Sequence, residues 1–214
     1  MTIDYSVYRR SDCGEMAALL GEVFSERDPP AVATGLTSAD FEHFVRLLCP
    51  KAAEEGLSIV ARARETGEMV GALLAEDSAT IMPEGMATLS PRFDPIFDIL
   101  GQLDAEYRKG EPPRKGECLH LFLLGVARTH AGRGIGHGLV EACLKHAAPK
   151  GFHIAVTEAT NSTSQHIFRK QGFVERVRGS YLDHRFDDRA YFASIAEEHI
   201  GPILFDRALV VSKP

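Results

Sequence analysis

The segment 126–147, VARTHAGRGIGHGLVEACLKHA, decides the fold because a glycine-rich turn in it connects an apolar run to a helical pattern. The run that leads into the turn, CLHLFLLGVA (118–127), is almost continuously apolar, which is typical of a strand inside a covered sheet. After the turn, Leu139, Val140, Cys143 and Leu144 recur at helical spacing. A turn that enters a helix through glycines can bind a phosphate with backbone N–H groups, so the segment predicts an anion site.

The spacing of the glycines excludes two common phosphate loops. A Walker A loop requires Lys followed by Ser or Thr, and neither pair follows these glycines. The dinucleotide fingerprint GxGxxG requires glycine where His137 or Leu139 stands. Glu158 does end the next strand, where a ribose-binding acid would lie. A dinucleotide-binding oxidoreductase therefore remains a less favoured alternative, since its βαβ unit normally begins the chain.

The remaining periodicities predict a mixed α/β sheet of about seven strands with helices on both faces. Strands are expected at 3–10, 57–64, 69–77, 118–127, 152–159, 173–186 and 201–211, and helices at 16–24, 41–50, 96–107, 139–147 and 161–172. Antiparallel hairpins precede one central βαβ unit, so the sheet is not a doubly wound parallel one. Residues 82–116 hold five of the eleven prolines and predict an insertion within one domain spanning 1–214.

Composition narrows the class of protein. The net charge of −6 argues against a sequence-independent nucleic-acid binder. No apolar run approaches the roughly 20 residues that span a bilayer, and the N-terminus lacks the order of a signal peptide. The four cysteines form no CxxC pair, which predicts four free thiols, no metal site and a reducing cytoplasm. We expect a cytoplasmic monomer or homodimer without nucleic-acid or membrane partners.

The glycine loop resembles the pyrophosphate loop of the GNAT (Gcn5-related) N-acetyltransferases. The family pattern is Arg or Gln, two residues, Gly, one residue, then Gly or Ala, and it maps onto 131–136, with Ala131 in place of the usual Arg or Gln. A second signature agrees with it: Asn161 stands eleven residues before Gly172–Phe173, as in the helix that flanks the thiol end of CoA in the family. The two motifs occur in the family's order, so the resemblance implies a GNAT fold and acetyl-CoA as cosubstrate.

Shorter stretches are similar to the insect arylalkylamine (dopamine) N-acetyltransferase subgroup. Asp28–Pro29 stands where the subgroup has an acid before proline, residues 93–107 match its helical insertion, and His199–Ile200–Gly201 matches its His-x-Gly. The resemblance implies a primary amine of a small molecule as acceptor, arylalkylamine-like or polyamine-like, attacked directly in a ternary complex. A non-catalytic acyl-CoA sensor on the same fold is the alternative.

The resemblance also implies which residues contact CoA. In the family a backbone N–H of the fourth strand stabilises the oxyanion where the sheet splays, and Gly125 would permit a bulge at that point. Arg128 could meet the 3′-phosphate, and the loop provides backbone donors together with the charge of Arg133. The expected CoA-binding residues are Leu124, Gly125, Val126, Arg128, Ala131, Gly132, Arg133, Gly134, Ile135, Gly136, His137, Asn161 and Phe168.

Acyl transfer to an alkylamine requires removal of a proton from a group with a pKa near ~10. Asp28 is one candidate base, although Asp-Pro also simply initiates turns. His120 is the other, because period-two alternation puts it on one face with Phe122, Leu124 and Val126. A buried structural histidine is the competing interpretation, and Phe122 replaces the second His of the vertebrate enzymes' His-x-His pair.

A general acid is less evident. Many relatives place Tyr seven residues after the Asn, and Phe168 stands there instead. Ser164 and Thr160 match serines of the insect subgroup, although capping and packing are alternative roles for their hydroxyls. For the acceptor, the expected contacts are Phe24, Phe122 and His199, with core packing as the alternative for the aromatic residues.

Overall fold

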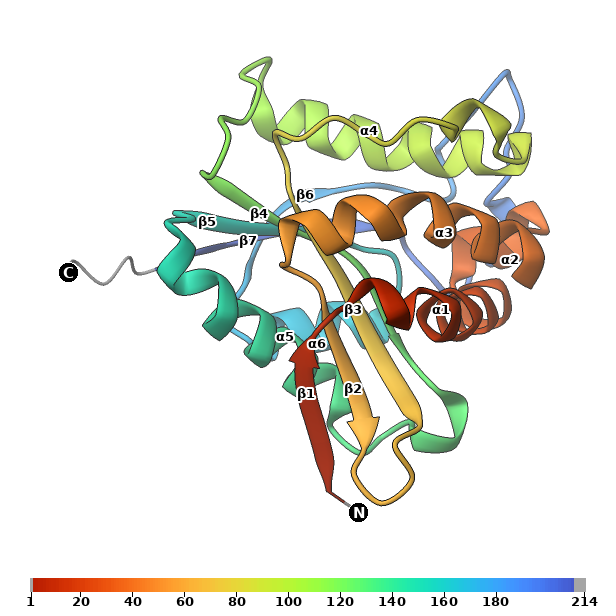
Figure 1. The fold of residues 1–214 in the computed structure, drawn as a ribbon. Helices are drawn as coiled ribbons and strands as arrows, with labels where there is room; N and C mark the ends of the chain where they lie inside the picture. Colours follow the sequence, from red (N-terminus) through yellow and green to blue (C-terminus); the bar gives the residue numbers. More distant parts are fainter. Residues whose placement is uncertain (1, 210–214) are drawn as a thin grey trace.

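A computed structural model describes residues 2–209, and its centre is a seven-stranded sheet in the order β1-β2-β3-β4-β5-β7-β6 (Figure 1). Neighbouring strands are antiparallel except β4 and β5, which are parallel. This confirms the predicted mixed sheet. The strands are β1 Ile3–Val7, β2 Ile59–Ala63, β3 Met69–Asp77, β4 Cys118–Val126, β5 Ile154–Ala159, β6 Val174–Arg178 and β7 Ile203–Ala208.

Helices cover both faces of the sheet (Figure 1). One face carries α1 Cys13–Arg27, α2 Pro29–Thr34, α3 Ser38–Glu55 and α4 Asp94–Arg108, and the other carries α5 Ile135–Ala147 and α6 Ser162–Lys170. Short 3₁₀ turns lie at Arg10–Asp12, Met86–Thr88, Pro91–Phe93, Arg128–His130, Ala148–Lys150 and Ala193–Ile195. Within residues 2–209, no helix is long and apolar enough to cross a membrane.

The strand β3 runs through the centre and is buried along its whole length. Its alternate residues therefore enter two separate cores: Ala72 and Leu74 pack with α1 and α3, and Leu73 and Ala75 pack with α5. This double burial explains why the central strands read as continuous apolar runs.

A β-bulge interrupts the pairing of β4 with β3. Leu74 pairs with Leu123 and Ala75 pairs with Leu121, so Phe122 is the extra residue. The bulge reverses the alternation: Phe122 packs in the α1–α3 core, whereas Leu124 and Val126 pack in the α5 core. The predicted single face was therefore wrong, and the bulge lies at Phe122 rather than at Gly125.

The sheet splays between β4 and β5. These strands pair only over Cys118–His120 and Ile154–Val156, although both continue beyond that point. Thr157 Oγ1 donates a 2.8 Å hydrogen bond to the carbonyl of Leu121 where the strands separate. Beyond this bond, β4 exposes one backbone edge to the gap.

Three local predictions differ from the structure. Asp28–Pro29 begins a short helix, α2, rather than a simple turn, because proline is suited to the first helical turn. The helix α3, expected to end near Pro50 or shortly after, continues to Glu55, and Gly56 caps it in the left-handed conformation. Strand β6 stops at Arg178, where the chain turns away from the sheet. The predicted last strand also included 210–211, which lie outside the described residues.

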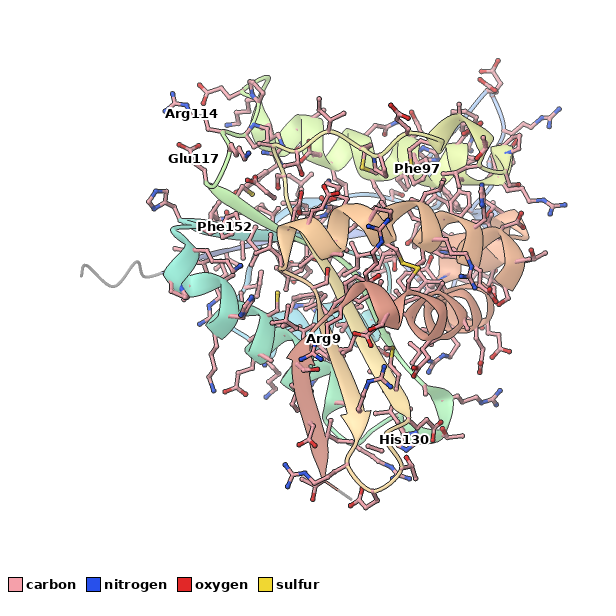
Figure 2. All side chains as sticks on the ribbon, in the orientation of Figure 1. Arg9, Phe97, Arg114, Glu117, His130 and Phe152 are labelled. Carbon is pink, nitrogen blue, oxygen red and sulfur yellow. A yellow bond between two sulfur atoms is a disulfide. The ribbon has the colours of Figure 1, made fainter. Side chains whose placement is uncertain are left out.

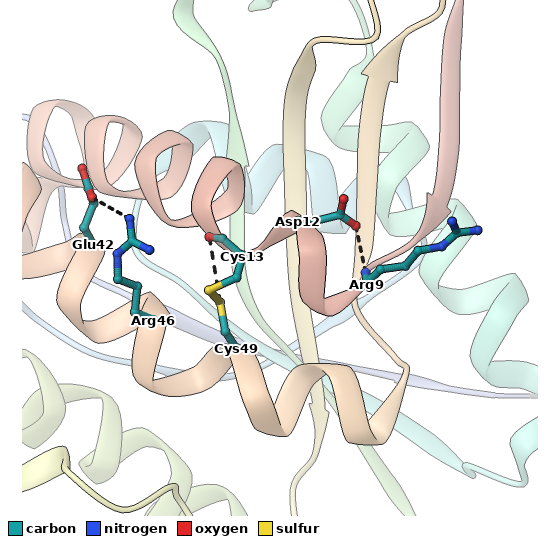
Figure 3. The surroundings of a disulfide bond; sticks show 6 residues. All are labelled: Arg9, Asp12, Cys13, Glu42, Arg46 and Cys49. Carbon is teal, nitrogen blue, oxygen red and sulfur yellow. Dashed lines mark hydrogen bonds and ion pairs between the residues drawn. A yellow bond between two sulfur atoms is a disulfide. The ribbon is translucent and has the colours of Figure 1, made fainter.

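Two cysteines are paired, so the prediction of four free thiols was wrong. Cys13 begins α1 and Cys49 lies in α3, and a disulfide joins them across a Cα–Cα distance of 5.8 Å (Figure 3). The two helices pack closely together, which brings residues 36 positions apart into contact. Cys118 and Cys143 are free and buried.

Candidate active site

A cleft of about 800 Å³ opens at the splay and extends between the sheet and the α1–α4 layer. Figure 2 labels residues from two of its walls, Phe97 on α4 and His130 in the turn after β4. Its wall contains most of the residues that the sequence singled out. They are Phe24, Asp28, Phe122, Leu124, Val126, Ala131, Gly132, Gly134, Ile135, Gly136, His137, Thr160, Asn161, Ser164 and Phe168.

The glycine loop places the start of α5 on the cleft. Gly132 and Gly134 have backbone φ values of +74° and +77°, which residues other than glycine rarely adopt. Gly136 has a different reason to be glycine, since a Cβ there would lie 2.9 Å from Ile167 Cδ1. Within residues 2–209 no side chain caps this helix start. Its first N–H groups, which lack intrahelical partners, are therefore available to an anion.

Three predicted CoA contacts lie off the cleft wall. Arg128, before the loop, and Arg133, within it, have exposed side chains. Gly125 faces α1 instead: a Cβ there would lie 2.6 Å from Leu20 Cδ2, so glycine permits the helix to approach β4. Its role in the structure is close packing.

Asn161 and Ser164 cap the N-terminus of α6 reciprocally. Ser164 N donates to Asn161 Oδ1 over 2.9 Å, and the Ser164 hydroxyl donates to the Asn161 carbonyl over 2.9 Å. The Ser164 hydroxyl is thus engaged in capping, although both residues also line the cleft. Phe168, farther along α6, is buried and packs against Phe173, which follows the helix.

Asp28 lies at the junction of α1 and α2 and is buried on the cleft wall. Its Oδ2 accepts a 3.3 Å hydrogen bond from Ala31 N, and its Oδ1 accepts a 2.5 Å hydrogen bond from Thr160 Oγ1. Burial raises the pKa of Asp28 to about 6, against the opposing effect of these two hydrogen bonds. The group can therefore exchange a proton near neutral pH.

His120 is held between two carboxylates. Its Nδ1 lies 3.1 Å from Glu76 Oε1 and its Nε2 lies 2.8 Å from Glu158 Oε2. Burial lowers the pKa of His120, but the two carboxylates outweigh burial and raise it to about 10. An imidazolium that donates from both nitrogens is already protonated at neutral pH, so the geometry favours the structural interpretation of His120 over the base.

One end of the cleft is aromatic. Phe24 stacks on Phe41 with ring centroids 4.9 Å apart, and Phe122 meets Phe44 edge-on at 5.8 Å. His199, in contrast, is not among the residues that line the cleft. It follows the last 3₁₀ segment, and its backbone N–H donates to the carbonyl of Ile195. The phenyl rings at this end of the wall come from α1, α3, α4, β4 and the turn before α4: Phe24, Phe41, Phe44, Phe93, Phe97 and Phe122.

Among the polar residues on the wall that sequence did not assign to this site are two with charged side chains, Arg27 and Glu158. The sequence indicates a role for Glu158 only as a ribose ligand and indicates none for Arg27. Arg27 Nη2 donates a 2.5 Å hydrogen bond to the carbonyl of Val126 at the end of β4. The period-two alternation of side chains along β5 could have placed Glu158 on the same face as Thr160. The contact of Glu158 with His120, however, depends on β4 and β5 being neighbours in the sheet, which the alternation does not reveal.

Comparison with solved structures shows the same fold in several proteins. The C-terminal condensation domain of Ebony, solved with β-alanyl-dopamine, matches with a TM-score of 0.88 and 17% identity over 97% of this chain and 99% of that one. Arylalkylamine N-acetyltransferase 2 from Aedes aegypti gives 0.79 and 18% over 98% and 100%. The polyamine N-acetyltransferase of Drosophila melanogaster gives 0.75 and 20% over 97% and 100%.

Family comparison agrees with the fold. Residues 22–173, which include the glycine loop, the splay and α6, match the model described as acetyltransferase (GNAT) family. The match supports an acyltransferase enzyme rather than a dinucleotide-dependent oxidoreductase. The chain belongs to the GNAT acetyltransferase family.

Proposed function

We propose that the protein transfers the acetyl group of acetyl-CoA to the primary amine of a small molecule, by direct attack in a ternary complex. The observation that carries this proposal is that one cleft holds both the start of α5 and the buried carboxyl of Asp28. The first can bind an anionic cosubstrate, and the second can accept a proton. Acyl transfer from a bound cosubstrate to an amine requires the cosubstrate and the proton acceptor to lie in one site, so that the reacting groups meet.

The cosubstrate would enter at the splay. Backbone N–H groups of Ile135, Gly136 and His137 would bind the pyrophosphate, where the helix dipole also favours negative charge. The pantetheine arm would run along the unpaired edge of β4, which begins after His120. Ala131 provides no long polar side chain, so this site depends on backbone donors.

The acceptor ammonium must lose its proton before it attacks the thioester. Asp28 would take it, directly or through water, because its raised pKa lies within range of neutral pH. Thr160 holds one carboxylate oxygen in place and would fix the direction of transfer. Phe168 has no hydroxyl, so the leaving thiolate would take its proton from water.

The aromatic end of the cleft favours an acceptor with an apolar body. Two of the matched structures bear the names arylalkylamine and polyamine N-acetyltransferase, and a third contains β-alanyl-dopamine. An arylalkylamine would fill the phenyl-lined end with its ring and direct its amine toward Asp28.

Calorimetry with acetyl-CoA and a free-thiol assay over arylalkylamines, polyamines and amino acids test the proposal. We expect acetyl-CoA to bind, NAD not to bind, and at least one amine to release thiol and gain the mass of an acetyl group. Tight binding of acetyl-CoA without thiol release from any amine would show that the proposal is wrong.

A further inference from the structure

A row of alternating charges crosses the molecule from α3 to the cleft. Lys51 Nζ donates to Glu76 Oε2 over 2.5 Å, and His120 joins Glu76 to Glu158. The four side chains come from α3, β3, β4 and β5, and Glu76 and His120 are directly paired across the sheet. Their exposed fractions are all 15% or less, so solvent screens these contacts weakly.

Only the last member of the row, Glu158, lines the cleft. Its Oε2 accepts from His120, while within residues 2–209 no hydrogen bond reaches Oε1. The imidazolium fixes the orientation of the carboxylate, and Glu76, itself held by Lys51, fixes the imidazolium. Glu158 is therefore an oriented acceptor whose second oxygen is available to a bound molecule.

The position of Glu158 relative to Asp28 follows from β5. Ala155 and Ala159 pack in the α5 core, so residues 158 and 160 point to the opposite face, where Phe122 lies. Thr160 contacts Asp28 on that face. Residues two apart on a strand are separated by about 6–7 Å. Glu158 thus lies about one such step along the chain from Thr160, the residue that contacts the base, and on the wall of the same cleft.

From this arrangement we propose that Glu158 determines acceptor specificity by binding a second hydrogen-bond donor of the acceptor, about 7 Å from the amine nitrogen. A ring hydroxyl of an arylalkylamine or the far ammonium of a diamine provides this chemistry. The inference rests on the proposed function, because it assumes that the acceptor's amine lies at Asp28.

Steady-state kinetics with two matched pairs of amines test it: tyramine against phenethylamine, and 1,4-diaminobutane against butylamine. We expect the wild-type protein to prefer the member with the second donor in at least one pair by about tenfold in kcat/KM, a typical effect of a hydrogen bond to a charged group. In Glu158→Gln the amide directs N–H groups into the cleft once its oxygen accepts from His120. The preference should then vanish, mainly through KM.

The exposed Glu22→Gln variant on α1 is the matched control and should keep the wild-type preference. Circular dichroism and calorimetry with acetyl-CoA establish that Glu158→Gln is folded and binds its cosubstrate. Should Glu158→Gln fail to fold, Glu158→Asp, which retracts the carboxylate by one methylene, should reduce the preference. Turnover without preference in the wild-type protein, or preference that survives in Glu158→Gln, would overturn this inference alone. Absence of turnover with every amine would overturn the proposed function and this inference with it.

Discussion

The hydroxyl of Thr160 donates to the carboxylate of Asp28, which joins the end of β5 to the start of α2 across the cleft. The two residues lie 132 positions apart in the chain. Asp28 is buried, and this bond favours its ionised form while burial opposes it. The pKa of the proposed base is therefore set by its burial and by an opposing contact with Thr160, both of which only the complete fold creates.

Replacing Thr160 by Val should raise the pKa of Asp28 above about 6, because the bond that favours the carboxylate is lost. The acidic limb of the kcat/KM profile should move to higher pH, with a several-fold loss of activity at pH 7. Thr160→Ser keeps the hydroxyl and should keep the wild-type profile. If the acidic limb does not move in Thr160→Val, Thr160 does not influence the pKa of the base.

His120→Phe should destabilise the protein by about 3–5 kcal/mol at pH 7, because Glu76 and Glu158 would lose their shared buried partner. The pKa of His120 is raised, so its stabilisation is complete below about 6.5 and is lost as pH rises through about 10. Urea unfolding at pH 7 and pH 10 should therefore show a smaller difference between variant and wild type at pH 10. The exposed His153→Phe should change little at either pH.

Gly125→Ala should lower stability by about 1–3 kcal/mol, as expected for an added methyl group in a packed core. The new Cβ would lie 2.6 Å from Leu20 Cδ2, so α1 must move away from β4. Gly14→Ala, near the start of α1, meets no atom within 4 Å and should be neutral or stabilising. Thermal melting of both variants decides whether Gly125 is required for this approach.

Reduction of the Cys13–Cys49 disulfide should lower the melting temperature, with a loss on the order of 2–4 kcal/mol in the chain-entropy description. Cys49→Ser should reproduce the loss without reductant. Cys118→Ser changes a free thiol and should leave the response to reductant intact. Identical melting curves with and without reductant would show that the tether contributes nothing to stability.

The fold was largely predictable because its strongest signals are local. Glycines at 132 and 134 mark a left-handed turn, and the apolar run before them marks a covered strand. Helical and strand periods gave the element order around this unit. The resemblance of two motifs then implied the family that the match over 22–173 shows.

The residues that sequence misplaced depend on non-local contacts. One bulged residue, Phe122, reverses the faces of β4, and no local pattern marks it. The charge of His120 depends on carboxylates 44 and 38 positions away. The disulfide likewise depends on the packing of α1 against α3. These features follow from strand and helix neighbours, which a single sequence does not reveal.

The dependence of kcat/KM on pH for the wild-type protein and Asp28→Asn tests the central claim most directly. With an amine that the thiol assay identifies, wild-type kcat/KM should rise with pH through about 6, because Asp28 accepts a proton only when ionised. In Asp28→Asn, kcat/KM should fall about a hundredfold and the acidic limb near pH 6 should disappear, while calorimetry should show an unchanged affinity for acetyl-CoA. A variant that retains wild-type kcat/KM and the same acidic limb would contradict the account of Asp28 as the base.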